Sequence, residues 1–302
     1  MRFLSLALAL LAAVVLTPDA SSAQVRLKAD TEPAGGDSMR GKVVMVTGST
    51  DGLGREVALR VAALGAHVIV HGRNQERGKA VVAEIDKLGK GGARFYAADF
   101  ASLAEVRTLA QAVRRDYKRL DVLVNNAGIW IKERQVSKEG HELHFAVNYL
   151  AGFLLTRELL PVLTASAPSR VVNVSSLSQS AIDFSDVMLE RPGRAGQGYS
   201  QSKFAQILFT IDLAAELKDK NVTVTALHPA TLMDTSMVRE AGVGARSTVD
   251  EGAQAVMKQI TGDVQSGRYY NGQQPAQPLA QANDDAVRVK LHALSMQLTG
   301  LK

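Results

Sequence analysis

Short apolar runs alternate with longer amphipathic stretches along most of this sequence. The apolar runs are rich in valine and isoleucine and end at glycine, asparagine, serine or proline, which is typical of buried β-strands. They cover residues 42–48, 67–72, 93–99, 121–128, 170–176 and 222–229, with a weaker run at 268–272. The stretches between them repeat apolar positions every three to four residues, which predicts helices over residues 53–64, 81–88, 102–117, 142–163, 199–217 and 251–260.

The apolar runs are nearly continuous rather than alternating, which indicates strands that are covered on both faces, as in a parallel sheet. Strands that alternate with helices predict a doubly wound α/β sheet with right-handed crossovers. No internal repeat or interdomain linker interrupts the pattern after residue 39. We therefore expect one α/β domain over residues 39–302, with a parallel sheet of about seven strands and helices on both faces.

The first 38 residues do not fit this pattern. An apolar run after Arg2 is too short to span a bilayer, which needs about 20 apolar residues, and small residues suited to cleavage follow it. We expect a signal peptide over residues 1–23 and a disordered polar leader over 24–38, so that no membrane span remains. The signal peptide predicts export to the periplasm or the medium, whereas translation from Met39 would give a cytoplasmic protein.

Composition narrows the chemistry further. The chain has no cysteine, which excludes disulfides, thiolate metal sites and cysteine nucleophiles, and we expect no metal site. The formal net charge is +5, but acidic and basic residues are interspersed as on a solvated surface, so we expect no nucleic-acid partner. An apolar fraction of 46% is typical of a globular protein.

A glycine-rich turn, TGSTDGLG, follows the first predicted strand and contains Gly48, Gly52 and Gly54. Backbone N–H groups and a helix N-terminus meet at such a turn, and glycine has no Cβ to hold a pyrophosphate away. The spacing differs from G-x-G-x-x-G, so the turn alone could be purely conformational. Its place in the first β–α unit favours a Rossmann-type dinucleotide site.

The end of the second strand indicates which dinucleotide is bound. Sites that select NAD usually carry an acidic residue there for the ribose 2′-hydroxyl, but this chain reads VIVHGRN, with Arg73. A guanidinium suits a 2′-phosphate. We therefore expect NADP(H) to be preferred, with NAD(H) as the alternative cofactor, although Arg73 could also be a solvated loop cation.

Tyr199 and Lys203 lie one helical turn apart in the segment YSQSK. Residues four apart share a helix face, so the ammonium can lie beside the phenol oxygen. A neighbouring cation lowers the pKa of a phenol, and we therefore expect Tyr199 to exchange a proton with a carbonyl oxygen. Without further motifs, such a pair would more often be two solvent-facing side chains.

Seven motifs follow one another between residues 40 and 272: TGSTDGLG, AADF, NNAG, VNYLAGF, VVNVSS, YSQSK and LHPAT. In this order and with these separations they resemble the short-chain dehydrogenase/reductase family, in its non-extended branch. The long stretch 177–198, here called the rim insert, resembles the retinol-dehydrogenase-like subgroup and should form part of the substrate rim. The resemblance implies an NAD(P)-dependent oxidoreductase that acts on a small-molecule carbonyl or alcohol substrate.

The resemblance also implies site residues. Ser176, rather than Ser175, should hydrogen-bond the substrate oxygen beside Tyr199, and Asn148 should hold a water linked to Lys203, so that these four residues are catalytic. The implied cofactor contacts are Gly48, Ser49, Thr50, Gly52, Leu53, Gly54, Arg73, Asp99, Phe100, Asn126, Ala127, Gly128, Tyr199, Lys203, Pro229 and Thr231. As alternatives, the asparagine could be a structural amide, and the aspartate of AADF could cap the next helix.

The segment after the sixth strand departs from the family's pattern. Ala230 replaces the usual glycine after the proline, so either Thr231 or Thr235 could contact the nicotinamide carboxamide. Residues 232–246 have the glycines and mixed polarity of a mobile substrate lid. An apolar pocket or core packing would explain Leu177, Phe184, Leu232, Met233 and Met237 about equally well.

Partner and function alternatives remain open at this point. The helix from Tyr199 has a second apolar face that resembles the family's dimer helix and suggests a homodimer or homotetramer, with burial inside the monomer as the alternative. That face comprises Phe204, Ile207, Leu208 and Ile211. A rival function is a catalytically idle dinucleotide-binding redox sensor or partner-binding protein, which would not need all four catalytic residues. An epimerase or dehydratase of the extended branch is disfavoured by the glycine spacing and the short region after residue 240.

Overall fold

The computed structural model describes residues 39–302; the expected signal peptide and leader lie outside the described residues. One sheet of eight strands has the order β3-β2-β1-β4-β5-β6-β7-β8, and every neighbouring pair is parallel except β7 with β8. The strands are β1 (Val43–Val46), β2 (His67–Gly72), β3 (Gly92–Ala97), β4 (Val122–Asn125), β5 (Ser169–Val174), β6 (Val222–His228), β7 (Tyr269–Asn271) and β8 (Gln274–Ala276).

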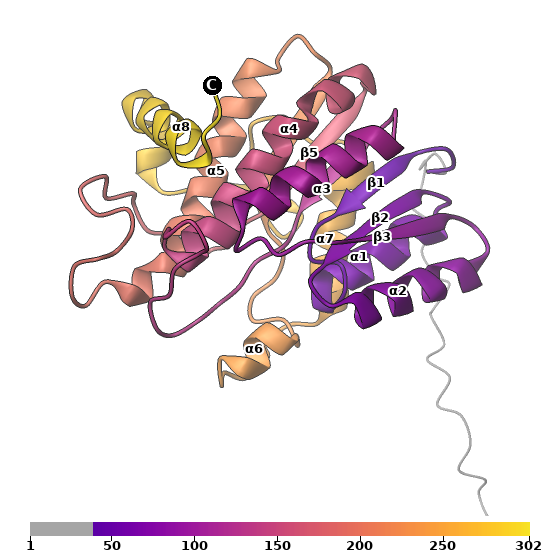
Figure 1. Ribbon diagram of the computed structural model, residues 1–302, viewed down its shortest axis with the longest axis horizontal. Coiled ribbons are helices and arrows are strands. Elements are labelled where there is room, and N and C mark those ends of the chain that lie inside the picture. The colour runs from indigo at the N-terminus through magenta and orange to yellow at the C-terminus, as the bar shows by residue number, and fades with distance from the viewer. Residues whose placement is uncertain (1–38) are drawn as a thin grey trace, which may run out of the picture. The chain divides into compact units, whose positions relative to one another are not determined.

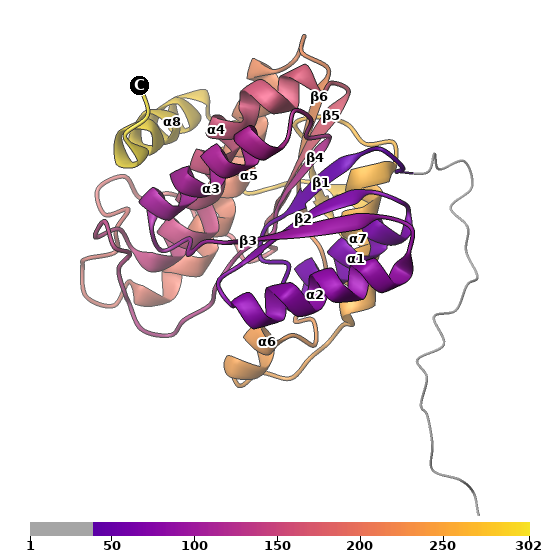
Figure 2. The same cartoon turned by 45° about the vertical axis from the view of Figure 1, so that its right-hand side comes forward.

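Helices cover both faces of the sheet, as Figures 1 and 2 show: α1, α2 and α7 lie on one face, α3, α4 and α5 lie on the other, and α8 packs outside α5. The helices are α1 (Gly52–Ala63), α2 (Gln75–Leu88), α3 (Leu103–Asp116), α4 (Ala151–Ala165), α5 (Gly198–Glu216), α6 (Ser236–Glu240), α7 (Val249–Thr261) and α8 (Asp285–Thr299), with a π-helical segment η1 (Phe145–Leu150) before α4 and short 3-10 turns η2 (Ala195–Gln197) and η3 (Ala280–Asn283). The prediction of a doubly wound α/β domain is confirmed.

Each face of the sheet has its own apolar core, because successive strand side chains point to opposite sides. In β1, Met45 faces the core under α3, α4 and α5, whereas Val44 and Val46 face the core under α1, α2 and α7. One helical stretch among the described residues, Phe145–Ala165, is long and apolar enough to cross a bilayer, but 72% of its most apolar window is buried inside the domain. That burial fits a core helix.

Three elements were not expected from the sequence. β8 pairs antiparallel with β7 through a tight turn at Gly272, whose φ is 56°, and so extends the expected seven strands to eight. The short helix α6 lies within the predicted lid. The helix α8 is capped by Asp284 and ends at Gly300, which has the left-handed φ of 64° that glycine favours at a helix end.

The expected dimer face of α5 is not on the surface. Phe204, Ile207 and Leu208 are fully buried within the domain, and α5 packs against η1, β6 and α8. For these three residues the alternative, burial inside the monomer, holds, and α8 packs on α5; Ile211, the fourth residue of the face, is half-buried. Oligomer formation through another surface stays a prediction.

A buried row of amides and hydroxyls joins the carboxyl ends of β4 and β5 to the helices beside them. Asn125 Nδ2 donates hydrogen bonds to Thr156 Oγ1 in α4 and to Asn173 Oδ1, both at 2.9 Å. Asn173 Nδ2 in turn donates to Thr210 Oγ1 in α5 at 2.8 Å. An unpaired buried amide costs free energy, so this row favours one register of β4 and β5. The row lies at the end of the strands where the predicted site begins.

Candidate active site

The glycine-rich turn after β1 is joined directly to the turn after β4. Thr47 Oγ1 accepts hydrogen bonds from the N–H groups of Asn126 and Ala127, at 2.9 and 3.0 Å. A Cβ at Gly48, whose φ is 64°, would lie 2.9 Å from Ala127 Cα, and one at Gly54 would lie 2.3 Å from Gly48 O. Both positions therefore require glycine, and the predicted cofactor residues of the two turns lie side by side.

The start of α1 offers unpaired N–H groups. Asp51 caps the helix by accepting a hydrogen bond from the Gly52 N–H at 2.8 Å. Within residues 39–302, no acceptor faces the N–H groups of Leu53 and Gly54. These donors, next to glycines that leave room for close approach, fit the pyrophosphate of a dinucleotide.

Ser49 and Thr50 have different positions in the turn. The buried Ser49 hydroxyl donates to Val46 O at 2.7 Å and accepts from the His71 N–H at 3.0 Å, so it ties β1 to β2. Thr50 lies against Gly72, where a Cβ would be 2.6 Å from the threonine methyl. Of the two predicted cofactor residues, the serine hydroxyl is thus already engaged within the protein.

His71 is a site residue that the sequence reasoning missed. Its Nδ1 accepts a hydrogen bond from the Gly48 N–H at 3.1 Å, so Nε2 carries the proton and donates to Ala98 O at 3.2 Å. Burial lowers the pKa of His71 to about 4, which keeps both bonds at neutral pH. The His71 ring stacks on the Phe100 ring at 4.3 Å between centroids. Phe100, a predicted cofactor residue, is itself buried. The sequence signal that could have indicated His71 is a histidine within a valine-rich strand.

Asp99 and Arg73, the two residues expected near the adenosine part of the cofactor, differ in their contacts within the protein. Asp99 Oδ1 accepts a hydrogen bond from the Ala101 N–H at 3.0 Å, and the Asp99 N–H donates to Glu105 Oε2 at 2.7 Å. The carboxylate therefore bonds the turn before α3, whereas the helix cap is Ser102, whose hydroxyl accepts from the Glu105 N–H. Arg73 is exposed directly after β2 and has no hydrogen-bond or ion-pair partner within residues 39–302.

Three of the four predicted catalytic residues meet at the end of β5. The Ser176 side chain lies near the Tyr199 hydroxyl and lowers its pKa, and Lys203 Nζ lies 5.7 Å from the centroid of the Tyr199 ring. Lys203 Nζ also donates to Val174 O at 2.9 Å. The Ser175 hydroxyl instead donates to the backbone carbonyl of Lys203 at 2.6 Å. Of the two adjacent serines, Ser176 is therefore the one beside the phenol.

Asn148, the fourth residue, lies in the π-helical segment η1. Its Oδ1 accepts from the Ile129 N–H at 2.7 Å, and its Nδ2 donates to Ser202 Oγ at 3.0 Å. A Cβ at Gly128 would lie 3.3 Å from both Asn148 Oδ1 and Lys203 Nζ. The amide and the ammonium thus approach the same point, and π-helical turns often occur at functional sites. The expected water between them stays a prediction.

The pKa values of Tyr199 and Lys203 differ from those expected from the sequence. Burial raises the pKa of Tyr199, and the nearby Ser176 side chain offsets this rise only in part. Burial also lowers the pKa of Lys203 to about 7. The protein by itself therefore does not give the expected lowering of the phenol pKa by the neighbouring lysine, because removal from water disfavours each charged form. Tyr199 is protonated at neutral pH.

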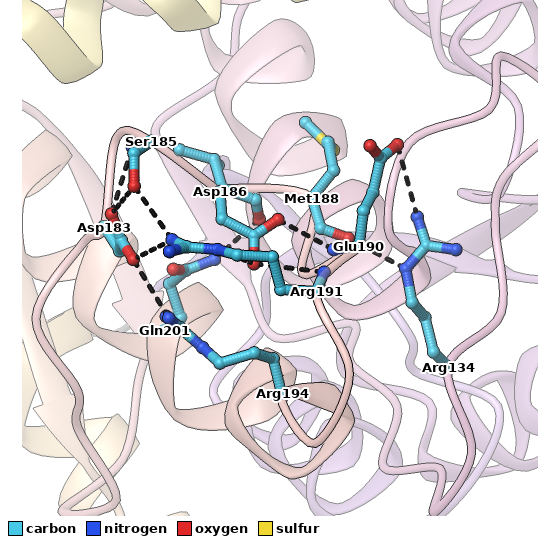
Figure 3. Close-up of polar contacts among 10 residues, drawn as sticks. Arg134, Asp183, Ser185, Asp186, Met188, Glu190, Arg191, Arg194 and Gln201 are labelled. Atoms are coloured by element: carbon cyan, nitrogen blue, oxygen red, sulfur yellow. Dashed lines mark hydrogen bonds and ion pairs between the residues drawn. The ribbon is translucent and has the colours of Figure 1, made fainter.

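The rim insert is held in place by ion pairs, which Figure 3 shows. Arg191 contacts Asp183 at 2.6 Å and Asp186 at 3.1 Å, both within the insert. Arg134 comes from a different segment and donates to Met188 O at 2.9 Å. These contacts give the insert a defined conformation next to Ser176 and link it to the segment before η1.

The predicted lid lies against the glycine-rich turn. The Ser236 hydroxyl at the start of α6 donates to Asp51 Oδ2 at 2.6 Å. A Cβ at Gly52 would lie 3.2 Å from the Thr235 methyl. Thr231, by contrast, has its hydroxyl hydrogen-bonded to His228 Nε2 at 3.0 Å. Of the two threonines left open, Thr235 therefore lies at the cofactor turn.

The other residues of this segment serve the fold. Pro229 is buried, and Leu232 has a φ of 49°, which is rare for a residue with a branched side chain. Met233 packs into the core under α1 and α7, whereas Phe184 packs at the opposite core. Met233 and Phe184 therefore lie at different cores, and Leu177, beside Ser176, is 49% exposed.

Several large apolar side chains are exposed in the segments that border the site. They are Trp130 (40% exposed) in the segment after β4, Leu177 (49%) in the rim insert, Val243 (45%) in the lid and Leu279 (39%) in the segment after β8. The Leu279 N–H donates to Gln179 Oε1 of the insert at 3.1 Å, so two of these segments are in contact.

Comparison with known proteins identifies the family. The short chain dehydrogenase family model matches residues 42–244. Human retinol dehydrogenase 13 is 35% identical over 288 residues, covering 87% of this chain and 86% of that protein. An uncharacterized protein of Mycobacterium paratuberculosis has a crystal structure that matches with a TM-score of 0.74 at 30% identity, over 88% of this chain and 96% of that one. A short chain dehydrogenase of Burkholderia cenocepacia J2315, in complex with NADP, matches with a TM-score of 0.65 at 28% identity, over 78% and 97% of the two chains. The chain therefore belongs to the short-chain dehydrogenase/reductase family, in its retinol-dehydrogenase-like subgroup, and is an NAD(P)-dependent oxidoreductase.

Proposed function

We propose that this protein transfers hydride between NADP(H) and an apolar carbonyl or alcohol at a site made by Tyr199, Ser176, Lys203 and Asn148. The observation that carries the proposal is the proximity of three side chains: Ser176 is close enough to the Tyr199 hydroxyl to lower its pKa, and Lys203 Nζ lies 5.7 Å from the centroid of the phenol ring. A hydroxyl donor pair at the carboxyl end of a strand, beside a glycine cradle for a dinucleotide, suits polarisation of a carbonyl oxygen.

The protein residues supply the proton chemistry of this reaction. Bound NADPH would supply the hydride in reduction. Ser176 and Tyr199 hold the carbonyl oxygen, and the raised pKa of Tyr199 keeps its proton available for donation at neutral pH. The phenolate left after donation is stabilised by the ammonium form of Lys203. Asn148 fixes the Ile129 backbone next to the lysine, where a proton can return from solvent.

The choice of NADP(H) is supported by Arg73, which is exposed beyond β2 without a partner among residues 39–302. Replacing it by alanine removes one charge-assisted contact to a 2′-phosphate, so Arg73→Ala should lower kcat/KM for NADPH by about 10- to 100-fold and leave NADH unchanged. Lys79→Ala, which removes an exposed cation from α2, is the matched control. Equal losses with both cofactors would contradict the assignment.

An apolar substrate is supported by the exposed side chains around the site. Trp130, Leu177, Val243 and Leu279 are each exposed, and Leu177 directly follows Ser176, so its side chain is available to contact an apolar ligand. The relative named a retinol dehydrogenase also acts on a largely apolar alcohol, according to its name. We therefore expect long-chain or polyene aldehydes to have lower KM values than short polar ones.

A turnover assay tests the proposal against the rival of a catalytically idle sensor. Wild type and Tyr199→Phe are compared on a panel of aldehydes, ketones and alcohols, with NADPH absorbance and NADPH binding measured in parallel. The enzyme should lose about 100-fold or more of kcat in the variant, at saturating NADPH, because a general acid contributes that much. Wild type that binds NADPH but turns over no member of the panel would favour the sensor.

A further inference from the structure

Glu142 and His144 form a fully buried polar pair just before η1, with side-chain exposures of 1% and 2%. Glu142 Oε1 accepts hydrogen bonds from His144 Nδ1 at 2.8 Å and from the His144 N–H at 3.0 Å, and Oε2 accepts from the Phe145 N–H at 2.8 Å. The carboxylate thus caps the start of the helix that carries Asn148.

The histidine extends this pair to the segment after β4. The Ile131 N–H donates to His144 Nε2 at 3.1 Å, so Nε2 is the unprotonated nitrogen and Nδ1 carries the proton that is donated to Glu142. With both ring nitrogens engaged, the imidazole has one tautomer and one orientation. It therefore links the segment of Asn126 and Gly128 to the helix start.

The same pair abuts the first residue of α5. A Cβ at Gly198 would lie 2.6 Å from His144 Nδ1 and 2.8 Å from Glu142 Oε1. The next residue is Tyr199, whose ring meets the His144 ring edge-on, at 6.3 Å between centroids and 84° between planes. Tyr199, at the start of α5, therefore lies next to the buried pair of Glu142 and His144, whose orientation is fixed by hydrogen bonds.

We propose that Glu142 and His144 are positioning residues for Tyr199, holding the start of α5 and the segment after β4 so that the phenol hydroxyl lies beside Ser176. The proposal rests on the proposed function, since the hydroxyl is the proton donor there. Neither side chain touches the reacting atoms. Their effect is on the geometry of the donor, to which proton transfer is sensitive.

The test displaces the contact while leaving both side chains present. In Gly198→Ala the new Cβ must push against His144 and Glu142, whereas Gly196→Ala, two residues earlier, meets nothing within 4 Å and is the matched control. The purified full-length variants are compared by kcat and KM for an aldehyde, NADPH affinity and thermal midpoint. His144→Asn, which keeps a donor for Glu142, and His144→Ala form a second pair.

The proposal predicts that Gly198→Ala lowers kcat by about 10- to 100-fold, as for a misplaced donor, with NADPH affinity and KM within about twofold of wild type. Gly196→Ala should match wild type, and His144→Asn should retain more activity than His144→Ala. A wild-type kcat in Gly198→Ala would overturn the proposal, as would an equal loss of kcat and NADPH affinity. If instead Tyr199→Phe were fully active in the same assay, the proposed function itself would fail.

Discussion

At the residue scale, the site depends on a lysine that is unfavourable for the fold. Lys203 is fully buried, its Nζ is bonded to Val174 O, and burial lowers its pKa to about 7, well below its ordinary value near 10.4. The folded state therefore binds fewer protons at this residue than the unfolded state between those two pH values. The destabilisation caused by burying Lys203 is fully present below pH 7 and disappears as the pH rises towards 10.

Replacing this lysine by an apolar residue should therefore stabilise the protein and abolish turnover. Lys203→Met should raise the free energy of unfolding at pH 6 by a few kcal/mol, at most about 5 kcal/mol from the pKa shift, and by less at pH 9. Denaturant unfolding without cofactor measures this, with the exposed Lys218→Met as the control. A less stable variant at pH 6 would contradict the account of the buried charge.

At the element scale, the rim insert is a segment whose shape depends on charge. Asp183 accepts hydrogen bonds from the hydroxyl and N–H of Ser185 and contacts Arg194 at 3.0 Å, and together these hold its pKa well below the usual range. A depressed carboxyl pKa contributes stability above the ordinary value near 3.9, and that stability is lost as the pH falls through the lower folded pKa. The insert should therefore loosen only in acid.

Asp183→Asn should produce the acid-loosened insert at neutral pH, because it removes the carboxylate that two arginines contact. We expect faster amide hydrogen exchange within residues 177–198 and a higher KM for the carbonyl substrate, with unchanged NADPH affinity. Asp219→Asn removes an exposed carboxylate just after α5 and is the control. Exchange rates in the insert that equal those of wild type would show that the ion pairs do not hold it.

The elements that the sequence predicted are those whose pattern is local. The valine-rich strands and the glycine-rich turn follow from neighbouring residues, and the helical spacing paired Tyr199 with Lys203. The family resemblance added Ser176 to this pair. His71 was missed because it is a single polar residue whose partner Gly48 lies 23 positions away in the chain. The partners of Glu142 are its neighbours His144 and Phe145, and it was missed because its burial depends on tertiary packing. The direction of the Tyr199 pKa was also missed, since burial depends on packing that no four-residue motif contains.

At the scale of the whole molecule, α8 closes the domain over α5 and η1. Tyr149 of η1 is hydrogen-bonded to Ser295 at 2.7 Å, and Arg288 contacts Asp212 of α5 at 2.8 Å. Arg107 of α3 also donates to the carbonyl of Thr299 at the end of α8. The C-terminal helix thus completes the layer behind the helix that carries the phenol, over a face that would otherwise be apolar surface.

Truncating a buried residue of α8 should therefore weaken the whole domain. Leu291 is 1% exposed and Val289 is 68% exposed, two positions apart on the same helix. Leu291→Ala should lower the free energy of unfolding by about 2–5 kcal/mol, as for a cavity in a core, whereas Val289→Ala should change it by less than about 0.5 kcal/mol. Similar values for the two variants, from urea unfolding, would mean that α8 is not part of the cooperative fold.

The central claim is that Tyr199 supplies the proton while hydride passes between NADP(H) and a carbonyl carbon at this site. The most direct measurement follows deuterium from NADPH that carries deuterium at both hydrogens of the nicotinamide C4 into the product alcohol, by mass spectrometry, for wild type and Tyr199→Phe. We predict one deuterium per product molecule with wild type and at least about a 100-fold lower yield with the variant at saturating NADPH. Undeuterated product from wild type, or equal deuterium transfer by the variant, would contradict the account.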